Sequence, residues 1–102
     1  MNKQIIFTKD NLLVNSLEYD AEPSGNGIIY LHLENGSIEI DVESYFGQMD
    51  YASYCFSYTE DDIYNYYYLD DNSIEVVNEY LIENNIRAKY IEEVSEAASQ
   101  TF

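Results

Sequence analysis

The chain has very few basic residues and few of the residues that build metal sites or disulfides. Its 102 residues include four Lys or Arg, one Cys, one His, one Pro and no Trp. A single cysteine excludes an internal disulfide framework and fits a reducing compartment. Zinc sites use three or four Cys or His ligands, which Cys55 and His32 do not supply. The commonest small folds stabilised by disulfides or zinc are therefore excluded.

Catalytic motifs are missing as well. The four glycines do not cluster ahead of a helix, as a phosphate-binding loop requires. His32 lies on an expected hairpin beside an acid, which indicates a surface ion pair rather than a catalytic triad. Neither Asp61-Asp62 nor Asp70-Asp71-Asn72 continues into a calcium-binding EF-hand loop. Cys55 is expected to be a small buried hydrophobe. We therefore expect no enzyme, no catalytic residue, no metal and no cofactor.

Long apolar runs are absent too. No stretch approaches the ~18 residues of a membrane span, and the first residues lack the apolar core of a signal peptide. A chain with a net charge of −16 is repelled by nucleic-acid phosphates and by anionic lipid. We expect a cytoplasmic protein that binds neither nucleic acid nor membrane directly.

What is present is enough apolar side chain to fold. The chain is 46% hydrophobic and 16% aromatic, which is more than disordered acidic tails contain. We expect one domain over 1–102. Alternation over 28–33 and 37–42 around Asn35-Gly36 predicts a hairpin with a two-residue type I′ turn. The predicted cross-strand pairs are Leu33 with Ile38, Leu31 with Ile40 and Ile29 with Val42 on the core face, and His32 with Glu39 and Tyr30 with Asp41 on the wet face.

The remaining elements complete an α+β fold, an antiparallel meander with one main helix. Further strands are expected at 4–7, 12–19, 50–58 and 63–69, although 12–19 also fits a short helix. A helix is expected over 74–84, with cap oxygens from 71–73 and an end at Asn84-Asn85. Residues 86–91 then return as a strand, and the competing interpretation is a second helix over 88–98.

The acidic residues recur at intervals that regular elements turn into rows. Glutamates four residues apart in the helix lie ~5–6 Å apart, and alternate acids on a strand lie roughly 6.6 Å apart. Phosphates along a nucleic-acid strand have a comparable spacing. No Lys or Arg occurs between Lys9 and Arg87, whereas ordinary solvated faces mix both signs. The candidate acids are Glu39, Asp41 and Glu43; Glu60, Asp61 and Asp62; Asp70 and Asp71; and Glu75, Glu79 and Glu83, with Glu92, Glu93 and Glu96 as a further cluster.

Tyrosines are concentrated beside these acids. In a strand over 63–69, Tyr64, Tyr66 and Tyr68 share one face. One interpretation places this face in the core of a domain that lacks Trp. In the other, the rings are exposed binding anchors that attract Arg. On the second interpretation the three tyrosines join the candidate site.

In length, charge and its mixture of acidic and aromatic residues, the chain resembles the small, acidic, phage-encoded inhibitors that act as nucleic-acid mimics. This is the anti-CRISPR and anti-restriction class. The resemblance implies a stoichiometric inhibitor, monomer or homodimer, that occupies the basic DNA-binding surface of a nuclease effector such as Cas9 in the host cytoplasm. The competing interpretation is an immunity protein or antitoxin that neutralises a basic nuclease toxin. A third is an α+β module whose charge only keeps it soluble.

Overall fold

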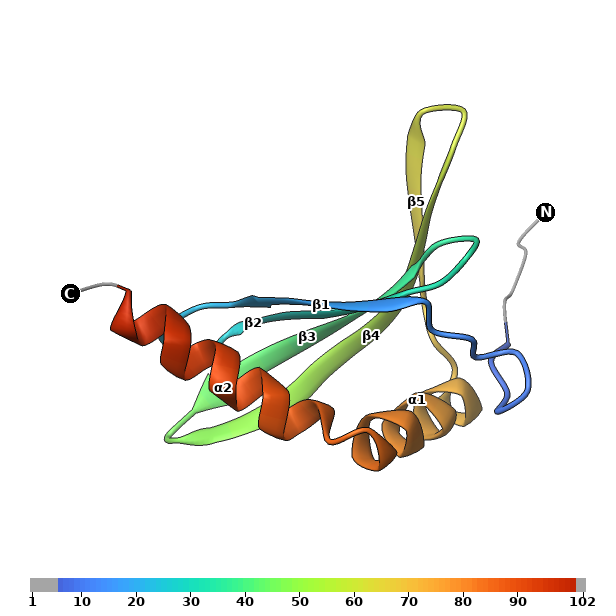
Figure 1. Ribbon diagram of the computed structural model, residues 1–102. Helices are drawn as coiled ribbons and strands as arrows, with labels where there is room; N and C mark the ends of the chain where they lie inside the picture. Colours follow the sequence, from blue (N-terminus) through green and yellow to red (C-terminus); the bar gives the residue numbers. More distant parts are fainter. Residues whose placement is uncertain (1–5, 101–102) are drawn as a thin grey trace.

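The computed structural model describes residues 6–100, which form one antiparallel sheet with two helices beneath it (Figure 1). The elements are β1 (Ser16–Ala21), β2 (Gly27–His32), β3 (Ser37–Tyr45), β4 (Gln48–Glu60), β5 (Ile63–Tyr68), α1 (Asp71–Glu83) and α2 (Ile86–Ser99). The five strands lie in chain order, and each is antiparallel to the next. The predicted α+β fold with an antiparallel meander is confirmed.

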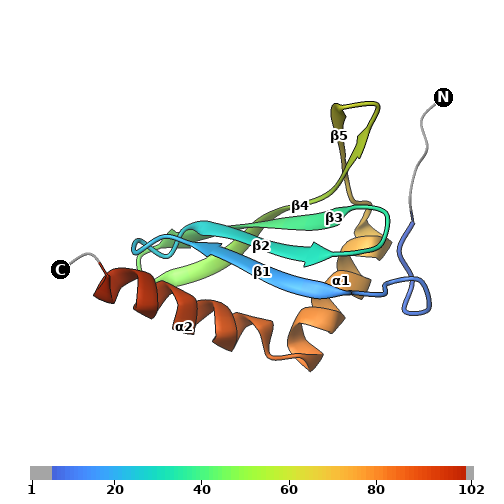
Figure 2. The same ribbon diagram turned by 45° about the horizontal axis from the view of Figure 1, so that its top comes forward.

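Both helices cover the same face of the sheet and leave the other face open (Figure 2). Strand side chains alternate between the two faces, so every second residue of β2 and β3 is buried against the helices. The buried apolar residues are Ile29, Leu31, Ile38, Ile40, Val42 and Phe56 from the sheet, Val77 and Leu81 from α1, Ile86 and Tyr90 from α2, and Phe7, Leu12 and Leu69 from connecting segments.

The hairpin of β4 and β5 extends beyond the rest of the sheet. Pairing of β4 with β3 ends at Ser57, whereas β4 continues to Glu60 and there pairs only with β5. Residues 58–65 form the projecting arm in Figure 1. At its tip, Asp61 and Asp62 have φ values of 53° and 65°, the positive φ that a type I′ turn needs at both central positions. Aspartate tolerates this conformation better than most residues.

The hairpin of β2 and β3 forms, but its turn differs from the prediction. The amide of Leu33 donates to the carbonyl of Gly36 at 2.7 Å, so Glu34 and Asn35 are the central residues. A type I′ turn needs a positive φ at both central residues, and none of Glu34, Asn35 and Gly36 has one. Gly36 is instead required for packing against β4. A Cβ at this position would lie 2.7 Å from the Phe56 ring, so the glycine permits close approach of β4.

The predicted register of this hairpin is wrong by two residues. The observed pairs are Ile29 with Ile40, Leu31 with Ile38, Tyr30 with Glu39 and His32 with Ser37. Because side chains alternate, an even displacement keeps each residue on its predicted face. The predicted core and wet faces are therefore right, and the individual pairs are corrected.

The N-terminal strand predictions are also corrected. Of the strand predicted at 4–7, residues 4 and 5 lie outside the described residues, and Ile6 and Phe7 are not in a strand. The amide of Phe7 instead donates to Ser73 Oγ of α1 at 2.9 Å, a partner incompatible with sheet pairing there. The strand predicted at 12–19 begins only at Ser16 and continues to Ala21.

The chain ends in a helix where a strand was predicted over 86–91. Asn85 adopts a left-handed conformation with φ of 52°, which turns the chain sharply from α1 into α2. Ile86 and Tyr90 are buried four residues apart, and Val94 follows at the same interval, so one helical stripe faces the sheet. The competing interpretation, a second helix, is correct.

Candidate functional site

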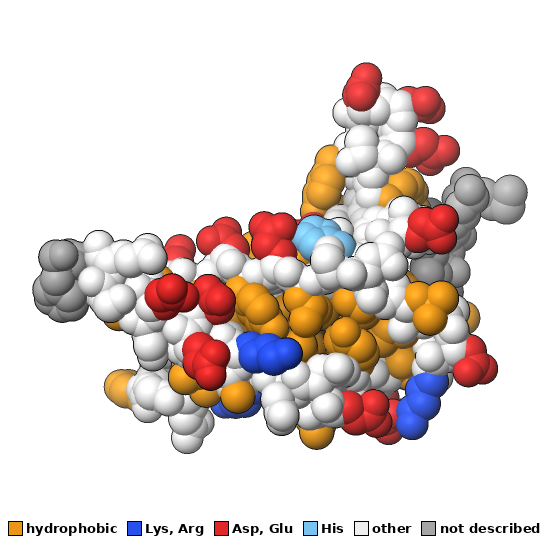
Figure 3. Space-filling model, viewed as in Figure 1, with side chains coloured by type: hydrophobic (Ala, Val, Ile, Leu, Met, Phe, Trp, Pro, Cys, Tyr) orange, Lys and Arg blue, Asp and Glu red, His pale blue; other side chains and the backbone are white. Residues whose placement is uncertain are grey.

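Acidic side chains from three strands point from the open face of the sheet. They are Glu18 and Asp20 of β1, Glu39, Asp41 and Glu43 of β3, and Asp50 of β4. Within residues 6–100, the Lys and Arg side chains belong to the loop before β1 and to α2, away from this face. Figure 3 shows acidic side chains along the upper edge of the sheet and at the end of the arm. The open face of the sheet is thus one acidic surface of the molecule, and it lacks Lys and Arg among the described residues.

The arm rises on the side of the open face (Figure 1), and a shallow, open hollow of about 240 Å³ lies beside it. The hollow is lined by Glu39, Asp41, Ser53, Cys55, Tyr64, Tyr66 and Tyr68. The Tyr64 hydroxyl donates a hydrogen bond to a carboxylate oxygen of Glu39, although β4 lies between their strands. This contact joins two groups that the sequence predicted separately, the β3 acids and the β5 tyrosines.

The tyrosines of β5 are exposed and form a ladder of rings. Tyr64, Tyr66 and Tyr68 are 58%, 56% and 70% exposed, so the interpretation as core residues does not hold for them. Successive ring centroids lie 6.1 Å apart. Tyr67, on the opposite side of β5, packs against the core instead. The rings can present faces to a cation, because aromatic faces carry negative electrostatic potential.

The carboxylates change the acidity of their neighbours. The hydrogen bond to Glu39 raises the pKa of the Tyr64 hydroxyl. Burial, and then the negative charges of Asp41 and Glu39, raise the pKa of the Cys55 thiol. Burial first and then surrounding carboxylates raise the pKa of Tyr30, which lies opposite Glu39. The carboxylates on this face therefore oppose additional negative charge.

His32 lies on the same face within a chain of hydrogen bonds. Its Nδ1 is 2.7 Å from Ser37 Oγ, and its Nε2 is 3.0 Å from Glu18 Oε1, so its acidic partner is Glu18 and not Glu39. The ring also stacks on Tyr30, with centroids 5.8 Å apart. Serine, histidine and acid are all present, but a triad also needs N–H donors aimed at an oxyanion. Ser37 lies in β3, which is paired on one side with β2 and on the other with β4, so the backbone around Ser37 is engaged in the sheet. The chain of hydrogen bonds holds β1, β2 and β3 together.

The glutamates of α1 lie on the helical layer and do not join the hollow. Glu75, Glu79 and Glu83 are exposed on the helix, and Glu79 forms an ion pair with Lys9 at 3.0 Å. The predicted helix stripe therefore exists as a separate surface, partly neutralised by a basic residue.

The three remaining acidic clusters have other locations, and one of them, Glu92, Glu93 and Glu96, is exposed on α2. Glu60, Asp61 and Asp62 are exposed at the tip of the arm. Asp70 caps α1: its Oδ1 accepts from the amide of Ser73 at 2.9 Å, and hydrogen bonds from Ser73 lower its pKa. Asp71 begins the helix, three residues earlier than predicted. Asp70 is thus explained by the fold, whereas the tip acids are free to contact a partner.

Sequence reasoning did not place Asp50 in the site, because a β-bulge decides its direction. Asp41 pairs with Ser53 and Val42 pairs with Tyr51, so Ala52 has no opposite residue. This extra residue shifts the alternation of β4 and turns Asp50 to the open face, opposite Glu43. Nothing in the local sequence marks the position of the bulge.

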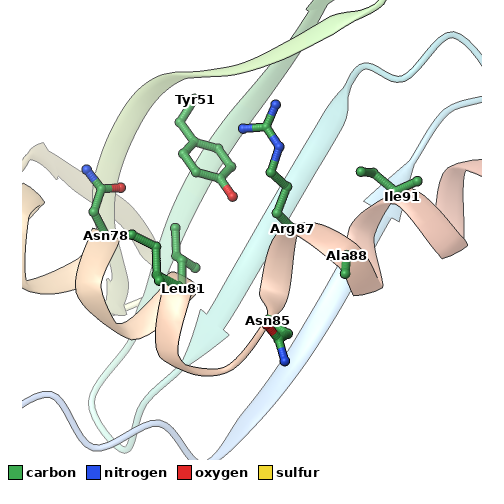
Figure 4. Close-up of a pocket in the computed structure, with 8 residues that line it drawn as sticks. Tyr51, Asn78, Leu81, Asn85, Arg87, Ala88 and Ile91 are labelled. Carbon is green, nitrogen blue, oxygen red and sulfur yellow. The ribbon is translucent and has the colours of Figure 1, made fainter.

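A larger groove, of about 630 Å³, lies on the helical side between α1, α2 and β4 (Figure 4). Leu81, Ala88 and Ile91 line it, and the guanidinium of Arg87 donates to the carbonyl of Met49 at 2.6 Å. The predicted site residues lie outside this groove.

Comparison of the chain with protein-family models, with curated proteins and with solved structures found no match. Within residues 6–100, no three His, Cys, Asp or Glu side chains are grouped as ligands for a metal ion. The helices of this described part are too short or too polar to cross a membrane.

Proposed function

We propose that the chain is a stoichiometric protein inhibitor whose open sheet face occupies the basic nucleic-acid-binding surface of a nuclease effector. This is the activity of the anti-CRISPR and anti-restriction mimics. One observation carries the proposal: the hollow joins the carboxylates of Glu39 and Asp41 to three exposed tyrosine rings.

The hollow suits the side chains that bind DNA. Carboxylates accept charge-assisted hydrogen bonds from Lys and from the forked donors of Arg, and tyrosine faces attract either cation. Outside the hollow, Glu43 continues the row of β3 at the two-residue interval. A net charge of −16 also draws a basic partner toward the chain before contact.

The charge on this face is retained at a cost to the fold. Glu43 lies directly opposite Asp50 on the neighbouring strand, and like charges in that arrangement destabilise a sheet. A cationic partner relieves this repulsion. The arrangement is therefore better suited to the complex than to the isolated chain.

The test measures displacement of fluorescent DNA from guide-loaded Cas9 and from a panel of restriction endonucleases. The unaltered chain should displace DNA from at least one enzyme at near-equimolar amounts. Glu39→Gln/Asp41→Asn/Glu43→Gln should weaken displacement by at least about tenfold, because removing one member of a close charge pair is costly. The control, Glu75→Gln/Glu79→Gln/Glu83→Gln, removes the same charge from α1 and should weaken it by less than about threefold.

Three results would count against the proposal. If the unaltered chain displaces DNA from none of the enzymes, the proposed function is wrong. If the two triple variants are weakened equally, total charge and not the open face causes inhibition. Blocked cleavage with DNA still bound would indicate an immunity-type inhibitor instead.

A further inference from the structure

The turn between β3 and β4 lies at the end of the sheet opposite the arm (Figure 1). Two large aromatic residues, Tyr45 and Phe46, occupy it. Tyr45 is 72% exposed and Phe46 is 91% exposed. Their rings meet edge to face, with centroids 4.5 Å apart. Phe46 therefore contributes almost nothing to the core of the isolated chain.

The backbone of this turn is also unfavourable for phenylalanine. Phe46 has φ of 50° and Gly47 has φ of 80°, so both central residues have the positive φ of a type I′ turn. Asn, Asp and Gly adopt this conformation readily, and the other such turn uses Asp61 and Asp62. A bulky side chain at such a position is uncommon and is retained where the surroundings or a function require it.

The base of the turn is held in place by other elements. The amide of Ser44 donates to Asn26 Oδ1 at 2.7 Å. On the other strand, Arg87 of α2 donates to the carbonyl of Met49 at 2.6 Å. The aromatic pair is therefore presented on a braced hairpin, which lowers the entropy cost of binding.

The surroundings of the pair specify the kind of partner. Tyr45 follows Glu39, Asp41 and Glu43 on the same face of β3, so the aromatic pair ends the acidic row. We propose that Tyr45 and Phe46 form an anchor that inserts into an apolar pocket bordered by basic side chains on a partner protein. The inference rests on the proposed function, and the pocket belongs to the protein that the open face binds. Anionic lipid and a second copy of the chain are disfavoured because both repel the acids.

The test replaces Phe46 by a residue that suits the turn. Phe46→Asn removes the ring and fits the left-handed backbone. It should leave the melting temperature unchanged or raise it, and it should raise the Kd for guide-loaded Cas9, or for the endonuclease that is inhibited, by about tenfold or more. The control is Ile82→Asn, an apolar residue of α1 that is 76% exposed on the helical side. It should change the Kd by less than about threefold.

The outcomes separate the anchor from the proposed function. If Phe46→Asn binds with the same Kd as the unaltered chain, while the triple variant at Glu39, Asp41 and Glu43 binds more weakly, the anchor alone is overturned. Absence of binding by the unaltered chain would overturn both. A lower melting temperature for Phe46→Asn would show that the ring supports the fold and would overturn the anchor. Binding to lipid would also overturn the anchor: in that case the unaltered chain sediments with phosphatidylcholine or phosphatidylserine vesicles and Phe46→Asn does not.

Discussion

Single side chains in the hollow report the local field, and Cys55 is the most useful because it is the one cysteine of the chain. Its thiol lies beside the carboxylates of β3, and burial together with Asp41 and Glu39 raises its pKa. Thiols react as thiolates, so a raised pKa makes the cysteine slow to react. The reactivity of Cys55 can therefore report the charge on the open face.

Asp41→Asn should lower the pKa of the Cys55 thiol and increase its rate of alkylation by iodoacetamide at pH 8. The reason is the loss of one of the two charges that oppose thiolate formation. Mass spectrometry of the alkylated fraction with time measures the rate. The control, Glu92→Gln, removes an equal charge from α2 and should leave the rate unchanged. Equal rates for Asp41→Asn and the unaltered chain would contradict the account.

Asp70 gives a pH-dependent prediction. Its pKa is lower in the folded chain than in the unfolded chain, because Ser73 donates to the carboxylate. Its contribution to stability is therefore present above the unfolded pKa and is lost as pH falls through the folded pKa. Asparagine also caps helices but does not titrate.

Urea unfolding from pH 7 to pH 3 should show this difference. The stability advantage of the unaltered chain over Asp70→Asn should be constant above about pH 5 and shrink below about pH 4, near the unfolded pKa of Asp. Asp10→Asn, which leaves the cap intact, is the control and should show no such narrowing. If the difference in the free energy of unfolding between the unaltered chain and Asp70→Asn stays constant down to pH 3, titration of the Asp70 cap does not contribute to it.

At the scale of elements, the contact between β3 and β4 depends on Gly36. A Cβ there would lie 2.3 Å from the Ser57 carbonyl oxygen and 2.7 Å from the Phe56 ring. Gly36→Ala should therefore lower the free energy of unfolding by about 1–3 kcal/mol through overpacking. Urea denaturation measures the change. Gly47→Asn is the control, because that position has open space and a positive φ that Asn tolerates. Equal stability of Gly36→Ala and the unaltered chain would show that the strands can separate freely.

The same glycine shows how far sequence reasoning reaches. Alternation identified the two faces of β2 and β3 and the strands that became β4 and β5. It did not fix the register, because Asn35-Gly36 resembles a turn motif while Gly36 is needed for packing against Phe56. A contact between residues far apart in the sequence is invisible in a local pattern.

The second helix illustrates a pattern with two meanings. Ile86, Ala88 and Tyr90 alternate as in a strand, whereas Ile86, Tyr90 and Val94 follow a helical stripe. Both periods fit so short a segment. A strand would bury Ala88 together with Ile86 and Tyr90, whereas Ala88 is exposed between the two buried residues, as in a helix.

The residues of the candidate site could be predicted individually, but their proximity in the structure could not. Glu39 and Asp41 follow from alternation in β3, and Tyr64, Tyr66 and Tyr68 from alternation in β5. Their shared hollow depends on the position of the arm, which no local pattern specifies. The direction of Asp50 depends on the bulge at Ala52 in the same way.

At the scale of the whole molecule, acids on the open face repel one another, so salt should affect stability and binding in opposite directions. Raising NaCl from 20 to 500 mM shortens the Debye length from roughly 20 Å to roughly 4 Å. The melting temperature should rise by several degrees, whereas association with the inhibited nuclease should slow. Differential scanning fluorimetry and stopped-flow fluorescence measure the two quantities. The melting temperature of Glu39→Gln/Asp41→Asn/Glu43→Gln should rise less with salt. A melting temperature that falls with salt would mean that attraction dominates the surface.

The central claim is that the chain binds through its open sheet face. Hydroxyl-radical footprinting of the complex with guide-loaded Cas9, or with the inhibited endonuclease, tests it most directly, because both layers carry exposed reactive side chains. The account predicts protection of Tyr64, Tyr66 and Tyr68, while Ile82 and Ile91 on the helical side react as in the free chain. Protection of Ile82 and Ile91 with the three tyrosines still reactive would contradict it.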